Sequence, residues 1–255
     1  MSIIIKSDQE IELMRRAGRI VAIVLDILKS QVKPGMRTEE LDIIADKEMK
    51  RLDGVSSFKG YPGLPGAIRY PATVCVSVND EIVHGIPGKR VLHEGDIVSI
   101  DFGAIYRGYH GDAAVTVGLG QVSPKAKELM ETTDGALHAG IAAAHAGAKL
   151  GDVSAAIQQY AESHGFSVIR EYTGHAIGQK LHEEPQVPNF GVPGEGPVLR
   201  KGMTFALEPM LSTGGWLTRL DGNQWTVYTS DGSLAAHFEH TIAITDGEAE
   251  VLTAL

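Results

Sequence analysis

The sequence lacks the features that are typical of secreted or membrane proteins. Its single cysteine, Cys75, excludes an internal disulfide, as is usual in a reducing compartment. No stretch approaches the roughly 20 apolar residues of a transmembrane helix, and residues 1–6 are too short for the apolar region of a signal peptide. We therefore expect a cytoplasmic protein with no membrane association.

Runs of lysine and arginine are also absent. The 23 Lys and Arg residues are outnumbered by 32 Asp and Glu residues, and the net charge of −9 argues against a general nucleic-acid-binding surface. What the chain does have is 43% hydrophobic residues in a length of 255, enough for a large core in one domain or two small ones.

Apolar residues at helical spacing predict four helices. The first begins behind the capping box of residues 7–10 and ends before Pro34. The others are expected from Thr38 to Asp53, from Ser123 to about His145, and from near Asp152 to before Gly165. Strands are expected near residues 74–78, 97–105, 113–117, 167–172, 204–209, 225–229, 235–245 and 250–253.

A weak internal repeat relates the two halves of the chain. Residues 35–41 and 147–153 each join a long helix to a shorter one, and each helix pair precedes strands with acidic residues. This order of elements predicts an α+β fold in one domain, residues 1–255. The domain would contain two similar helix-helix-strand halves, about 7–120 and 121–255, with a site where they meet.

Two carboxylates are predicted to lie side by side in one hairpin. Residues 97–105 are apolar and β-branched, residues 106–109 favour a turn, and residues 113–117 favour a returning strand. A turn between Tyr106 and Arg107 would place Asp101 opposite Asp112. A buried, unpaired carboxylate costs several kcal/mol, and a divalent cation would remove that cost for both. The alternative is that these residues cap turns at the surface.

Three more polar residues lie in apolar strand contexts: His175, Glu208 and Glu239. Considered singly, His175 could be a hydrogen-bonded core histidine, Glu208 could pair with an arginine, and Glu239 could face solvent. Jointly with Asp101 and Asp112 they require a counter-charge, and no Lys or Arg is embedded in those strands. Two metal ions would supply about four positive charges. One imidazole with several carboxylates suits Co, Mn, Fe(II) or Zn.

A series of motifs in one order now gives a family resemblance over nearly the whole chain. The sequence resembles type I methionine aminopeptidases of the short bacterial kind, in the pita-bread metallohydrolase superfamily. The matching segments are residues 79–87, 99–103, 111–112, 173–178, 181–185, 207–210 and 238–241. The resemblance implies the pita-bread (creatinase/aminopeptidase) fold, a mainly antiparallel sheet with helices on its outer face.

The resemblance also implies a role for each ligand. Asp101 would chelate one of two divalent metal ions, His175 and Glu208 would bind the other, and Asp112 and Glu239 would bridge both. A metal-bound hydroxide would attack the carbonyl of the first residue, with Glu208 passing on a proton.

Two histidines match the family's catalytic residues that do not bind metal. His182 would hydrogen-bond the substrate carbonyl or oxyanion, and His84 would contact the scissile nitrogen. The remaining histidines, including His110 and His237, are expected to be solvated or structural.

The family's methionine pocket matches four positions, Tyr70, Cys75, Leu181 and Trp225, with Phe58 and Tyr61 as additions. Leu181 stands where many relatives carry Phe, and residues 63–69 resemble an insertion beside the pocket. Both features bear on pocket shape.

The implied function is removal of the initiator methionine from peptides and nascent proteins whose second residue is small. The implied enzyme is a cytoplasmic monomer without nucleic-acid specificity, and a transient ribosome contact is compatible with it. One alternative is an Xaa-Pro peptidase of the same fold, although such relatives usually carry an additional N-terminal domain. The other is a non-catalytic binding protein, which would be missing ligands that are all present here.

Overall fold

The computed structural model describes residues 3–63, 66 and 68–255. Within these residues, a nine-stranded sheet forms the centre of the fold, and every pair of neighbouring strands in it is antiparallel. Its order is β1-β4-β5-β14-β9-β7-β8, with β2 beside β4 and β15 beside β14. The strands are β1 (Val55–Ser56), β2 (Cys75–Val78), β4 (Ile97–Tyr106), β5 (Tyr109–Gly118), β7 (Gly174–Ala176), β8 (Glu183–Val187), β9 (Thr204–Leu207), β14 (Glu239–Ala243) and β15 (Glu250–Val251).

Two three-stranded sheets lie beside the central sheet. The first has the order β13-β10-β6 and the second β11-β12-β3. Their strands are β3 (Glu81–Val83), β6 (Ser167–Val168), β10 (Met210–Ser212), β11 (Thr218–Leu220), β12 (Val227–Thr229) and β13 (Ala235–His237). The expected architecture, a mainly antiparallel sheet with helices on one face, is confirmed.

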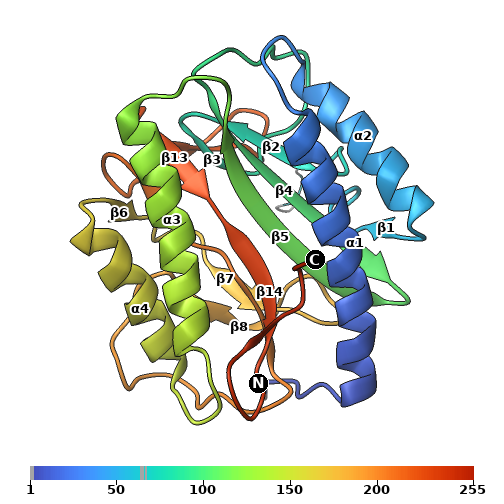
Figure 1. The fold of residues 1–255 in the computed structure, drawn as a ribbon, viewed down its shortest axis with the longest axis vertical. Helices are drawn as coiled ribbons and strands as arrows, with labels where there is room; N and C mark the ends of the chain where they lie inside the picture. The colour runs from blue at the N-terminus through green and yellow to red at the C-terminus, as the bar shows by residue number, and fades with distance from the viewer. Residues whose placement is uncertain (1–2, 64–65, 67) are drawn as a thin grey trace.

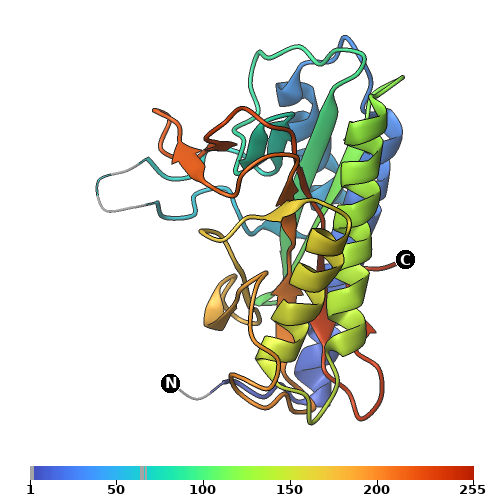
Figure 2. The same cartoon turned by 90° about the vertical axis from the view of Figure 1, so that its left-hand side faces the viewer.

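The four predicted helices are present in the described ranges, as α1 (Asp8–Gln31), α2 (Thr38–Arg51), α3 (Pro124–Ala143) and α4 (Leu150–Ser163). The predicted capping box starts α1, because the Ser7 and Glu10 side chains each accept the other residue's backbone N–H. The long helices pack on one side of the sheet, and the short strands and loops lie on the other (Figures 1 and 2). None of these helices combines the length and apolar character needed to span a bilayer.

The two helix-to-helix junctions make equivalent hydrogen bonds. Gly35 and Gly147 both have a left-handed backbone, with φ of 90° and 93°. Gly35 N–H donates to Leu92 O at 2.8 Å, and Gly147 N–H donates to Leu199 O at 3.0 Å. In each half an isolated bridge follows two residues later. These shared contacts support our proposal that residues 7–120 and 121–255 are related halves of one domain.

The β4–β5 hairpin differs from the predicted register by two residues. Its turn is Arg107–Gly108, so Asp101 pairs with Ala114, and Asp112 pairs with Gly103. The prediction that Asp101 and Asp112 are directly opposite is therefore wrong. Because side chains alternate with a period of two, this shift leaves both carboxylates on the same face as diagonal neighbours.

The turn residues explain the register and give a testable stability effect. Arg107 and Gly108 both have positive φ, 47° and 85°, as a two-residue hairpin turn with the twist of a β-ribbon requires. We expect Gly108→Ala to lower the free energy of unfolding by about 1 kcal/mol, because an L-residue resists this conformation. Urea unfolding measures the change. Gly222→Ala is the control, since that exposed glycine has open space around it and no positive φ. Equal effects at both positions would refute the turn assignment.

Candidate metal centre

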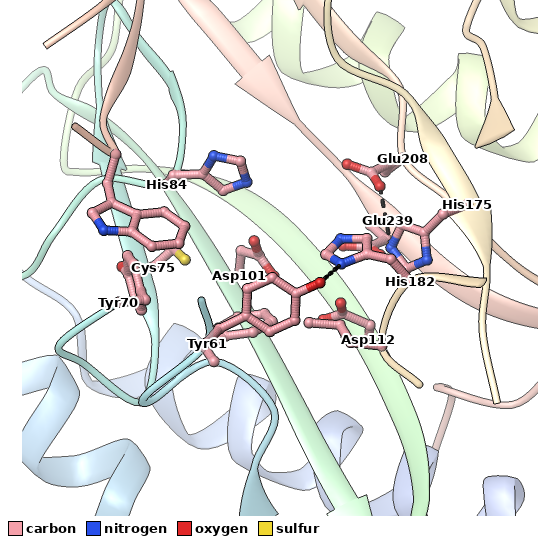
Figure 3. Close-up of a pocket in the computed structure, with 13 residues that line it drawn as sticks. Tyr61, Tyr70, Cys75, His84, Asp101, Asp112, His175, His182, Glu208 and Glu239 are labelled. Carbon is pink, nitrogen blue, oxygen red and sulfur yellow. Dashed lines mark hydrogen bonds and ion pairs between the residues drawn. The ribbon is translucent and has the colours of Figure 1, made fainter. Parts of the chain in front are cut away.

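One cavity is lined by every residue predicted for the site. Figure 3 shows the side chains that line it. Its lining comprises Phe58, Tyr61, Tyr70, Cys75, His84, Asp101, Asp112, His175, Leu181, His182, Glu208, Trp225 and Glu239. Polar and charged groups gather at one end of the cavity, and apolar side chains gather at the other (Figure 3).

The sheet order explains why four carboxylates meet. Asp101 lies in β4, Asp112 in β5, Glu239 in β14, and Glu208 directly follows β9. These are four successive strands of the sheet, so each contributes one carboxylate to the same face. Within the described residues, one buried oxygen each of Asp101, Asp112 and Glu239 has no hydrogen-bond partner.

Burial makes the four carboxyl groups difficult to ionise together. It raises the pKa of Asp101 to about 7. The pKa values of Asp112, Glu208 and Glu239 lie well above their ordinary range, first because of burial and then because of neighbouring carboxylates. Bound cations would lower these pKa values by stabilising the negative charges, and all four groups would then stay ionised. The orphaned oxygens therefore fit a metal centre.

His175 presents a nitrogen lone pair to these carboxylates. Its Nδ1 lies 3.0 Å from Ala176 O, so Nδ1 carries the hydrogen and donates it, and Nε2 is left free. Nε2 lies 3.5 Å from Glu208 Oε1. Burial lowers the pKa of His175 to about 3, so this contact joins a neutral imidazole to a carboxyl group and is not an ion pair. Ligand atoms of Asp112, His175 and Glu239 lie within 4.8 Å of one another.

Two further histidines border the metal centre. His84 has a left-handed backbone, with φ of 60°, and its ring meets those of Tyr172 and Trp225 edge-on. Burial lowers the pKa of His84 to about 4, and the charge of His182 contributes to this shift. Burial also lowers the pKa of His182. Both imidazoles are therefore neutral at about pH 7, and a neutral imidazole can donate one hydrogen bond.

The apolar end of the cavity is a narrow pocket. Tyr70 and Trp225 meet edge-on at 5.1 Å, and the Tyr70 hydroxyl donates to Gly85 O at 2.9 Å. Trp225 Nε1 donates to Ile68 O at 2.9 Å, which places the end of the 63–69 segment beside the pocket. Residues 64, 65 and 67 of that segment lie outside the described residues. Cys75 and Leu181 complete the buried wall and could receive an unbranched apolar side chain.

His237, which was expected to be solvated or structural, is not solvated and lies beside two of the proposed ligands. Its side chain is buried, and Nε2 lies 3.7 Å from Glu208 Oε2 and 3.9 Å from Glu239 Oε2. Within the described residues, neither ring nitrogen has a hydrogen-bond partner. A signal was present, because His237 precedes Glu239 by two residues and an extended chain places such residues on one face. His110, by contrast, is a buried structural group bonded to Ser57 Oγ at 2.9 Å.

Comparison with known proteins finds relatives over the whole chain. Residues 12–246 match metallopeptidase family M24. Methionine aminopeptidase of Clostridium acetobutylicum is 49% identical over 252 residues, 98% of each chain. Methionine aminopeptidase 1 of Bacillus subtilis is 50% identical over 251 residues, 98% of this chain and 99% of the relative.

Solved structures share the fold to different extents. The crystal structure of a methionine aminopeptidase from Thermotoga maritima matches with a TM-score of 0.96 and 47% identity, covering 100% of both chains. A prolidase from Pyrococcus furiosus matches with a TM-score of 0.79 and 22% identity, and the match covers 99% of this chain but 66% of the prolidase. The second likeness shows the fold alone.

Proposed function

Because the chain belongs to metallopeptidase family M24, we propose that this cavity hydrolyses the peptide bond that follows an N-terminal methionine. Relatives with about 50% identity over the full length are methionine aminopeptidases, and the activity of the chain is that of this class of metallo-exopeptidase. The Xaa-Pro alternative is disfavoured, because the prolidases that share the fold are far less similar and extend well beyond it.

The proposed metal ligands are Asp101, Asp112, His175, Glu208 and Glu239. The observation that carries this proposal is the meeting of three buried carboxylates and the half-buried Glu208 with one free imidazole nitrogen. We propose two divalent ions, of Co, Mn, Fe(II) or Zn, since the donors are one nitrogen and several oxygens. Bound there, such ions supply positive charge and make water a stronger acid near neutral pH.

The chain's own groups would then orient the substrate and move protons. His182 would donate a hydrogen bond to the substrate carbonyl oxygen, and this bond would strengthen as negative charge develops on that oxygen. Glu208 would take a proton from the attacking water and pass it to the departing amine. His84, on the other side of the cavity, would contact the scissile nitrogen and assist its departure (Figure 3).

Substrate selection would follow from the shape of the two ends of the cavity. The pocket formed by Tyr70, Cys75, Leu181 and Trp225 would hold the methionine side chain in apolar surroundings. Only a small second residue would fit beside the histidines. Nascent proteins carry their initiator methionine where they are made, so we propose a cytoplasmic monomer that acts on nascent chains and contacts ribosomes transiently.

Metal removal and a choice of peptides test this function. We expect Met-Ala-Ser to release methionine and Ala-Pro-Ser to remain intact, with release measured by chromatography. Excess chelator should abolish the activity, and added Co, Mn, Fe(II) or Zn should restore it. Full activity in excess chelator, with no metal found by elemental analysis, would exclude the proposed metal chemistry. Preferential cleavage of Ala-Pro-Ser would exclude the substrate.

A further inference from the structure

A short hydrogen bond joins a tyrosine of the pocket to the histidine beside the metal centre. The hydroxyl oxygen of Tyr61 lies 2.6 Å from Nδ1 of His182, although the residues are 121 positions apart. Their rings meet edge-on at 5.2 Å (Figure 3). Tyr61 follows β1, and His182 directly precedes β8, so each reaches the cavity from a loop.

The direction of this hydrogen bond is linked to the role of the other ring nitrogen of His182. A neutral histidine carries one hydrogen, on Nδ1 or on Nε2, and the bond made by one nitrogen decides the role of the other. If the Tyr61 hydroxyl donates to Nδ1, the hydrogen of His182 must be on Nε2. Nε2 makes no hydrogen bond within the described residues, so it remains available to a ligand in the cavity. Burial raises the pKa of Tyr61, which therefore keeps its proton to donate.

We propose that Tyr61 is a positioning residue, whose hydroxyl fixes the Nε2–H tautomer and the ring orientation of His182. This inference rests on the proposed function, in which His182 donates a hydrogen bond to the substrate carbonyl oxygen. The opposite tautomer would direct a lone pair at an oxygen that is gaining negative charge, and the interaction would become repulsive.

The loop that carries His182 is held by other contacts, which leaves the ring as the group that Tyr61 controls. Glu183 forms a buried ion pair with Lys6 at 2.7 Å. The backbone N–H of His110 donates to Gly178 O at 2.8 Å. Both contacts lie outside the Tyr61–His182 pair, so loss of one hydroxyl should leave the backbone of the loop in place.

The experiment compares Tyr61→Phe with Tyr109→Phe. The control loses a hydroxyl that accepts from Gln179 and donates to Glu10, and Tyr109 does not line the cavity. Histidine labelled with ¹⁵N in the full chain, metal-free and zinc-loaded, reports the tautomer by NMR at about pH 8, above the ordinary pKa of histidine. His182→Gln assigns the signal. Steady-state kinetics on Met-Ala-Ser accompany the spectra.

We expect His182 in the parent and in Tyr109→Phe to carry its hydrogen on Nε2, and to sample both tautomers in Tyr61→Phe. We also expect kcat of Tyr61→Phe to fall about 10- to 100-fold with KM little changed, as is usual when an orienting partner is removed. An unchanged tautomer in Tyr61→Phe, or hydrogen on Nδ1 in the parent, would overturn the inference. A changed tautomer with unchanged kcat would support the role of Tyr61 and refute the proposed role of His182.

Discussion

Asp112→Asn and Glu239→Gln are each expected to lower kcat/KM for Met-Ala-Ser by at least about 100-fold, because each removes a proposed ligand and loss of a mere orienting partner already costs 10- to 100-fold. The two residues lie on neighbouring strands and share a ligand triangle with His175. An amide keeps the shape of the side chain and removes its charge. The loss should therefore come with weaker metal binding and not with unfolding.

Calorimetric titration with Mn or Co, together with peptide kinetics, measures both effects. Glu128→Gln is the matched control, because it removes a carboxylate from the exposed surface of α3. Near-normal turnover and metal affinity in Asp112→Asn or Glu239→Gln would show that the carboxylate is not a ligand. Lost turnover with unchanged affinity would assign that carboxylate to the reaction and not to metal binding.

The buried carboxyl groups are expected to make the metal-free protein less stable as pH rises from their ordinary pKa of about 4 through their raised pKa values in the folded state. The expected loss is about 1.4 kcal/mol per pH unit for each group that is still protonated in the folded state. Asp112, Glu208 and Glu239 have pKa values well above those of an unfolded chain. Between the unfolded and folded pKa values, the folded state binds more protons than the unfolded state. Raising the pH across that window therefore favours unfolding.

Buried histidines have the opposite effect, but at lower pH. Burial lowers the pKa of His175 and His237 to about 3, so their contribution grows as pH rises from there to their ordinary value of 6.5 and is then constant. The two trends oppose each other below about pH 6.5, where the histidine contribution becomes constant. The carboxyl trend is therefore clearest between that pH and the ordinary pKa of the Cys75 thiol, about 9, above which the buried thiol contributes in the same direction.

Urea unfolding in chelator at several pH values above neutrality measures this slope. Saturating divalent metal should flatten the slope, since bound cations keep the carboxylates ionised in the folded state. Asp112→Asn should reduce it, because one raised pKa is removed. Metal-free stability that is flat or rises over this range would contradict the assignment of buried, unpaired carboxylates.

Local signals predicted the helices well, because helix caps and apolar periodicity depend on residues that are close in the sequence. The strands were harder where the chain changes sheets. Residues 235–245 were predicted as one strand, but β13 pairs with β10, and β14 pairs with β5 and β9. The change occurs at Phe238 and depends on partners that are distant in sequence. The hairpin register likewise depends on which residues adopt positive φ at the turn.

The candidate site was predicted more completely than the fold around it. Carboxylates in apolar strands and the order of motifs identified the proposed ligands, and the structure brings all of them to one cavity. The position of His237 beside Glu208 and Glu239 was not predicted, although its spacing from Glu239 was informative. The bond between Tyr61 and His182 could not be anticipated, because nothing local relates two loops that are 121 residues apart.

The position of β14 imposes an order on assembly. This strand lies between β5 and β9, and of the other sheet strands only β15 follows it in the chain. During synthesis the β4–β5 hairpin can form early, but the free edge of β5 and the edge of β9 stay unpaired until β14 has been made. Glu239 arrives with that strand. Until β14 joins β5 and β9, a partly synthesised chain would therefore have an open sheet and an incomplete set of acidic groups.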